Sequence, residues 1–126
     1  MGFFDLVNIR AINTKLKELM PVVDANMSRM ESYYKSNFKK IKKNEWGSSK
    51  EILVTKKENI DELLRQKKEL ELEFENVHNI VEKIKPITFL DDDSSYIHWK
   101  NELASVSWRY NFLIEELNSF EIYTEK

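Results

Sequence analysis

The sequence predicts an all-α fold, an antiparallel three-helix bundle with coiled-coil (heptad) packing. The 126-residue chain contains only two glycines and two prolines, which is too few turn residues for a structure rich in strands and loops. Apolar residues recur three or four positions apart over most of the chain, as they do on one face of a helix. We therefore expect long helices that pack along shared apolar stripes.

Two joints divide the chain into three helical stretches within one domain. The helices are expected at about residues 3–43, 49–85 and 94–122 of a domain covering 1–126. Gly47 marks the first joint, and Ser48 with Glu51 fits a capping box that starts the second helix. Pro86 marks the second joint, where Asp91–Ser95 supplies N-cap residues for the third helix.

The first and third stretches differ in regularity. Pro21 lies inside the first stretch, so we expect that helix to be kinked or split there, although its apolar pattern continues through the proline. The third stretch has an unbroken heptad seam without a polar member. That seam consists of Tyr96, Trp99, Leu103, Val106, Tyr110, Leu113, Leu117 and Phe120.

The third stretch also carries a second apolar stripe, directly opposite its seam. This stripe consists of Ile97, Ala104, Trp108, Phe112 and Ile122. A helix that is apolar on two opposite sides is normally covered on both. The first stretch, bent at Pro21, could cover the second stripe within the molecule. Alternatively, the stripe is exposed and binds another protein or a second copy of this chain, since exposed aromatic stripes mark binding surfaces.

A lysine-rich segment ends the first stretch, with aromatic residues between its lysines. The lysines form a candidate patch for an anionic partner: Lys35, Lys39, Lys40, Lys42 and Lys43. Basic charge with interleaved aromatics is a weak signal for nucleic acid, and the patch contains no arginine. Lysines at the C-terminus of a helix also complement its dipole. We therefore expect neither nucleic acid nor a membrane surface to be the main partner.

The sequence offers little for catalysis or for holding a cofactor. There is no cysteine, and the two histidines, His78 and His98, fall on different expected helices. A metal site needs three or four converging ligands, so we expect no metal and no cofactor. The run Asp91–Asp93 is explained by capping of the third helix. We expect a protein that is not an enzyme.

One feature resembles a known family. Trp46 and Gly47 lie between the first two expected helices, which resembles the tryptophan–glycine turn of the small helical-hairpin proteins of type VII secretion. In that family one residue separates the tryptophan from the glycine, whereas here they are adjacent and a third helix follows. The resemblance implies a secretion-associated helical protein as one alternative function.

Together these patterns predict a non-enzymatic protein–protein interaction module, such as a small adaptor, inhibitor or chaperone-like helical protein, that binds through the second stripe. The alternatives are a homo-oligomeric structural or secretion-associated protein and a lysine-patch binder of nucleic acid or an acidic surface. No signal peptide and no membrane-spanning stretch are evident, so we expect a cytoplasmic location, with leaderless secretion as the alternative. The abundance of Lys, Asn, Ile and Glu is typical of AT-rich genomes, which suggests a bacterium or phage.

Overall fold

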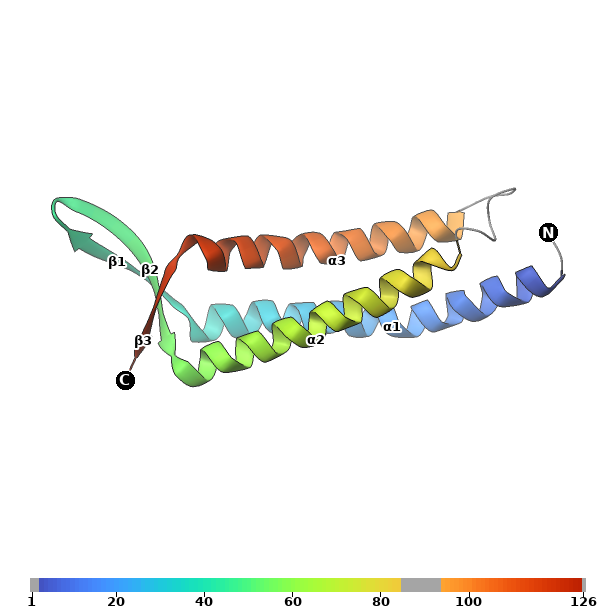
Figure 1. Cartoon of the computed structure of the whole chain (residues 1–126), viewed down its shortest axis with the longest axis horizontal. Coiled ribbons are helices and arrows are strands. Elements are labelled where there is room, and N and C mark those ends of the chain that lie inside the picture. Colours follow the sequence, from blue (N-terminus) through green and yellow to red (C-terminus); the bar gives the residue numbers. More distant parts are fainter. Residues whose placement is uncertain (1–2, 85–93, 126) are drawn as a thin grey trace.

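The computed structural model describes residues 3–84 and 94–125, which form three helices and a three-stranded sheet. The helices are α1 (Phe3–Asn37), α2 (Lys57–Glu82) and α3 (Ser94–Ser119), and the strands are β1 (Lys39–Glu45), β2 (Ser48–Lys56) and β3 (Glu121–Glu125). The three helices run alongside one another, with α2 antiparallel to α1 and α3 (Figure 1). The sheet lies at the end of the bundle where α1 ends and α2 begins.

The prediction of an all-α three-helix bundle is therefore wrong. The first helix ends at Asn37 instead of residue 43, the second begins at Lys57 instead of residue 49, and the third ends at Ser119 instead of residue 122. The segment 52–55, Ile-Leu-Val-Thr, is rich in β-branched residues, which favour a strand. The helical spacing of apolar residues in the second helix continues back through Leu53. For this reason the sequence pattern predicted a helix where the structure has a strand.

Two residues make the turn of the β1–β2 hairpin. Trp46 has φ of 51° and Gly47 has φ of 82°, so both central residues lie in the left-handed region that a two-residue hairpin turn of type I′ requires. Glu45 pairs with Ser48 across this turn, and the antiparallel pairing continues to Lys39 opposite Val54. The expected capping box at Ser48 is thus part of a hairpin instead of a helix start.

The third strand reaches the sheet by way of two helices. The strand order is β1-β2-β3, and β3 runs parallel to β2, with Ile52 opposite Glu121 and Leu53 opposite Ile122. Parallel strands need a long crossover connection, which here contains α2 and α3. A mixed sheet of this kind requires only one tight turn, so a chain with two glycines can form it.

The apolar stripes of the three helices meet in one core. The buried members include Leu16, Met20, Val23, Met27, Met30 and Tyr34 of α1, Leu63, Leu70, Val77, Ile80 and Val81 of α2, and Tyr96, Trp99, Val106 and Leu113 of α3. Leu53 of β2 joins the same core and is fully buried. α1 is one helix through Pro21, so it is not split there. The expected capping run Asp91–Asp93 and Pro86 lie outside the described residues.

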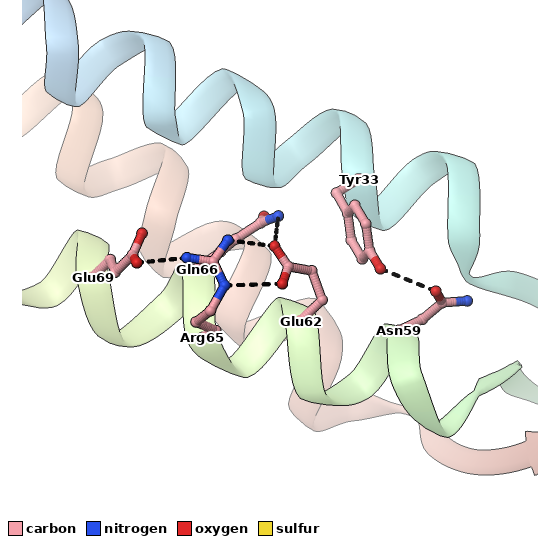
Figure 2. Close-up of polar contacts among 6 residues, drawn as sticks. All are labelled: Tyr33, Asn59, Glu62, Arg65, Gln66 and Glu69. Atoms are coloured by element: carbon pink, nitrogen blue, oxygen red, sulfur yellow. Dashed lines mark hydrogen bonds and ion pairs between the residues drawn. The ribbon is translucent and has the colours of Figure 1, made fainter.

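A small polar network joins α1, β2 and α2. The Thr55 hydroxyl, which is 2% exposed as a residue, donates to the carbonyl oxygen of Asn37 at 2.6 Å. The Asn59 amide donates to the Thr55 hydroxyl at 3.0 Å, and the Tyr33 hydroxyl donates to the amide oxygen of Asn59 at 3.0 Å (Figure 2). The last carbonyl oxygens of a helix have no partner within the helix. This network provides a partner for the carbonyl oxygen of Asn37, and it fixes the position at which α1 ends and the sheet begins.

The exposed side of α2 is lined by ion pairs one turn apart. Arg65 contacts the carboxylates of Glu62 and Glu69, and Gln66 donates to Glu62 at 3.1 Å (Figure 2). Hydrogen bonds from Arg65, followed by that from Gln66, lower the pKa of Glu62 to about 2. Such exposed pairs support the helix only weakly, so the core and the network at Thr55 hold α2 in place.

The buried phenol of Tyr34 should make the protein less stable in alkaline solution. Burial, together with the negative charge of Glu116, raises the pKa of Tyr34 to about 12, above the value near 10 that is usual for tyrosine. The unfolded chain then loses this proton at lower pH than the folded chain. The protonated Tyr34 therefore contributes its full stabilisation of the folded state below about pH 10, and this stabilisation is lost as the pH rises towards 12. We expect a loss on the order of 2 kcal/mol in the free energy of unfolding, measured by denaturant titration at several pH values.

Tyr34→Phe removes this titration and should reduce the alkaline loss. Tyr110, whose pKa is also raised, first by burial and then by Glu71, keeps its own contribution in that variant. An alkaline loss of the same size in Tyr34→Phe and in the unchanged protein would contradict the assignment to Tyr34.

Candidate functional site

The second stripe of α3 lies on the surface. We define the outer face of α3 by seven residues that are all exposed: Ile97, Asn101, Ala104, Trp108, Phe112, Glu115 and Ser119. These residues lie on the side of the helix away from the buried Trp99, Val106 and Leu113. The described residues leave this face uncovered, so the alternative in which the first helix covers it is not met in the described part of the chain.

Two large aromatic side chains form the centre of the outer face. Trp108 is 68% exposed and Phe112 is 58% exposed, and Ile97 towards the start of the helix is 47% exposed. The rings of Trp108 and Phe112 lie stacked, with centroids 5.7 Å apart and planes at 24°. The pair therefore presents one continuous apolar surface to solvent, with the small Ala104 one turn before Trp108.

α3 is held with this face outward by contacts on its two flanks. On one flank, the Arg109 guanidinium forms ion pairs with Asp24 and Glu31 of α1 and donates to the Ser28 hydroxyl at 2.9 Å. The indole N–H of Trp99 also donates to the side-chain oxygen of Asn13 of α1 at 2.8 Å. These contacts fix the rotation of α3 about its axis relative to α1.

The other flank of α3 is held by α2. The ring of Tyr110 meets that of Phe74 edge-on, with centroids 5.3 Å apart, and the Tyr110 hydroxyl donates to Glu71 at 2.9 Å. The outer face is thus the one side of α3 that neither neighbouring helix occupies.

The charged residues near the outer face have different surroundings. Arg109 is engaged with α1, and its hydrogen bond to Glu31 raises its pKa. The Lys100 ammonium lies 5.4 Å from the centroid of the Tyr96 ring. Glu115 is exposed, and its carboxylate has no partner within the described part of the chain. Lys100 and Glu115 are therefore the charges that remain available to a partner.

Ile122 does not belong to the outer face. It lies on β3, beyond the end of α3, and lines an apolar groove between α2 and α3 next to the sheet. The groove has a volume of about 150 Å³ and includes Leu64 and Ile114. The expectation that residue 122 continues the helical stripe is wrong because the chain turns into a strand after Ser119.

The lysine patch lies mainly on a strand of the hairpin. Lys35 is in the last turn of α1, whereas Lys39, Lys40, Lys42 and Lys43 lie on β1. Lys40 pairs with Glu116, and Lys43 pairs with Glu45 at 3.0 Å and donates to the Tyr123 hydroxyl at 3.1 Å. Lys39 and Lys42 are exposed and form no ion pair within the described residues. Lys35 is also exposed and without an ion pair among these residues, so Lys35, Lys39 and Lys42 are the free charges of the patch.

The hairpin carries an isolated tryptophan at its tip. The hairpin extends beyond the ends of the helices (Figure 1), and Trp46 at its turn is fully exposed. A tryptophan with positive φ is strained by about 1 kcal/mol relative to glycine or asparagine. Trp46 and Gly47 therefore join two strands and not two helices, which removes the placement on which the resemblance to type VII secretion proteins depended.

The described residues show no metal site and no membrane span. Within 3–84 and 94–125, no three His, Asp or Glu side chains come together in a way that could hold a metal ion. No helix in this part of the chain combines the length and apolar character needed to cross a bilayer. Comparison of the chain with protein-family models, with curated proteins and with solved structures finds no match.

Substitution of the two α3 tryptophans should separate the surface from the core. Trp108→Ala should change the free energy of unfolding by less than about 1 kcal/mol, because most of this side chain is already in water. Trp99→Ala should cost about 3–5 kcal/mol, because it empties a core position and removes the bond to Asn13. Urea denaturation followed by circular dichroism measures both values, and equal losses would contradict the assignment of Trp108 to the surface.

Proposed function

We propose that this protein is a non-enzymatic protein-binding module whose binding surface is the outer face of α3. The single observation that supports this most strongly is the stacked pair Trp108 and Phe112, more than half exposed on a helix whose other sides are packed. Tryptophan is among the residues most enriched at energetic centres of protein interfaces. A folded monomer gains nothing from keeping such a pair in water.

The binding mechanism is burial of this apolar surface against a complementary protein surface. Covering one tryptophan and one phenylalanine contributes several kcal/mol before the costs of association are subtracted. The rings are held in place by a helix that is fixed on both flanks, so little conformational freedom is lost on binding. Polar residues at the ends of the face, such as Asn101 and Glu115, then give orientation and selectivity.

A crosslinker placed in the outer face tests this function directly. Replacing Phe112 by the photoreactive amino acid benzoylphenylalanine should give a protein adduct when cells producing the chain are irradiated. The same replacement at Leu72, which is comparably exposed on α2, should give none and serves as the matched control. Adding Trp108→Ala should remove the adduct from position 112.

The mass of the adduct identifies the kind of partner. Twice the mass of this chain indicates a second copy, and any other mass indicates a different protein. Absence of a protein adduct at position 112, or equal adducts at positions 112 and 72, would contradict the proposal.

A second candidate function, supported by the hairpin, is binding of an anionic surface. Between residues 39 and 56 the hairpin carries six lysines and two glutamates, and its tip is the exposed Trp46. Lysines attract anionic lipid headgroups and nucleic-acid phosphates alike, and an exposed indole can enter a headgroup layer or stack on a base. Since Lys39 and Lys42 have no ion-pair partner among the described residues, they are the charges to test.

Charge reversal of these two lysines should weaken such binding at least tenfold. We expect this for Lys39→Glu with Lys42→Glu, measured by co-sedimentation with phosphatidylserine vesicles and by fluorescence anisotropy with a single-stranded oligonucleotide. The double variant Lys15→Glu with Lys17→Glu makes the same charge change on α1 and should leave binding nearly unchanged. If the unchanged protein binds neither probe at low salt, this second function is ruled out.

A further inference from the structure

We infer that the outer face of α3 pairs with the same face of a second copy of this chain, with the two helices antiparallel and Trp108 at the centre of the pair. This inference rests on the proposed function, since it names the partner of the same surface. It follows from the order of residues along the face, together with their size and charge.

The outer face has the same spacing when it is read from either end. Starting at Ile97, the seven residues follow one another at intervals of 4, 3, 4, 4, 3 and 4, and the sequence of intervals is identical from Ser119 backwards. Intervals of three and four residues place side chains along one seam of a helix. A twofold axis at Trp108 therefore brings every position of the seam level with another position of the same seam.

The residues that become level with one another are complementary in size. Ala104 comes level with Phe112 of the second copy, so a small side chain leaves room for a large one, and this happens twice. The two copies of Trp108 meet in the middle, and the stacking of Phe112 on Trp108 extends the aromatic contact on both sides. At the ends, Ile97 meets Ser119, whose hydroxyl is already bonded to the carbonyl oxygens of Glu115 and Glu116.

The polar residues on the face are complementary in the same arrangement. Asn101 comes level with Glu115 of the second copy, so an amide N–H can donate to a carboxylate. Lys100, the residue before Asn101, lies beside the same carboxylate and supplies the opposite charge. Neither Asn101 nor Glu115 has a side-chain partner within the described part of the chain, so both are free to make this contact.

A parallel arrangement of the two helices is much poorer. It would place Glu115 against Glu115, which repel, and Phe112 against Phe112 beside a pair of Ala104 residues that leave a gap. Like charges at a shared interface disfavour an arrangement, and unfilled space loses packing energy. The size and charge pattern of the face thus selects the antiparallel pair.

Because the chain contains no cysteine, single cysteines can report the arrangement. In the antiparallel pair, position 101 lies next to position 115 of the second copy, whereas the two copies of position 101 are about 20 Å apart. A disulfide requires Cα atoms within about 7 Å. An oxidised mixture of Asn101→Cys and Glu115→Cys should therefore form a mixed covalent dimer, and each variant alone should form almost none.

The control is a mixture of Asn101→Cys with Leu72→Cys, which should not crosslink because position 72 is on the exposed side of α2. Light scattering behind a sizing column should show a dimer of the unchanged protein that dissociates on dilution. Trp108→Ala should raise its dissociation constant about 30-fold or more, as expected for a central aromatic contact.

Two results would overturn the inference. Crosslinking of Asn101→Cys with itself would show a parallel pair, and a mass of one chain at every concentration would show that no pair forms. The second result leaves the proposed function standing if benzoylphenylalanine at position 112 still yields an adduct with a different protein. Absence of any protein adduct at position 112 would contradict both the pairing of two copies and the proposed protein-binding function.

Discussion

Three helices packed side by side can bury only about one side of each, and this limit governs the surface of the protein. The buried residues of α1 and of α2 fall on one stripe of each helix, and charged residues cover much of the remaining surface, where Val22, Leu64 and Leu72 are single exposed apolar residues. α3 does not comply, since Trp99 and Val106 fill the core while Trp108 and Phe112 remain in water. Its flanks are already occupied, by Arg109 against α1 and by Tyr110 against α2. The part of the chain that the structure describes, 3–84 and 94–125, has no further helix with which to cover the outer face.

At the end of the bundle the structure must provide hydrogen-bond partners for the polar backbone groups at the C-terminus of α1. The carbonyl oxygen of Asn37 accepts from Thr55, and Asn59 completes the contact from α2. This small network and the buried Leu53 join the sheet to the bundle, while the tip of the hairpin extends away from it. The lysines of β1 also protect an edge strand from pairing with other chains. The hairpin can therefore carry an exposed tryptophan without inviting edge-to-edge aggregation.

How far the sequence predicts this structure depends on the range of the interactions involved. The heptad seam predicted for the third helix contains the buried residues Tyr96, Trp99, Val106 and Leu113 of α3. The opposite placement of Trp108 and Phe112 identified a second face. The strands were missed because the helical phase of Leu53 and Ile60 continued across a β-branched segment, and because β3 is defined only by its pairing with β2. A parallel partner some 70 positions away leaves no local signal at Ile122. The turn at Trp46 was missed because tryptophan is rare where φ is positive.

The sites around the two exposed tryptophans differ in how specifically they select a ligand. Trp108 lies in a row of seven residues whose spacing, sizes and charges restrict the partner to a surface with matching positions, and a second copy of the same row meets these restrictions. Trp46 stands alone on a turn, with lysines along the strand behind it, so it restricts its ligand only to negative charge and an apolar layer or ring. A surface with many matched positions gives specificity, whereas an isolated ring with positive charge gives attraction without selectivity. For this reason pairing through α3 is the more selective of the two interactions, and the hairpin would act beside it without competing for the same residues.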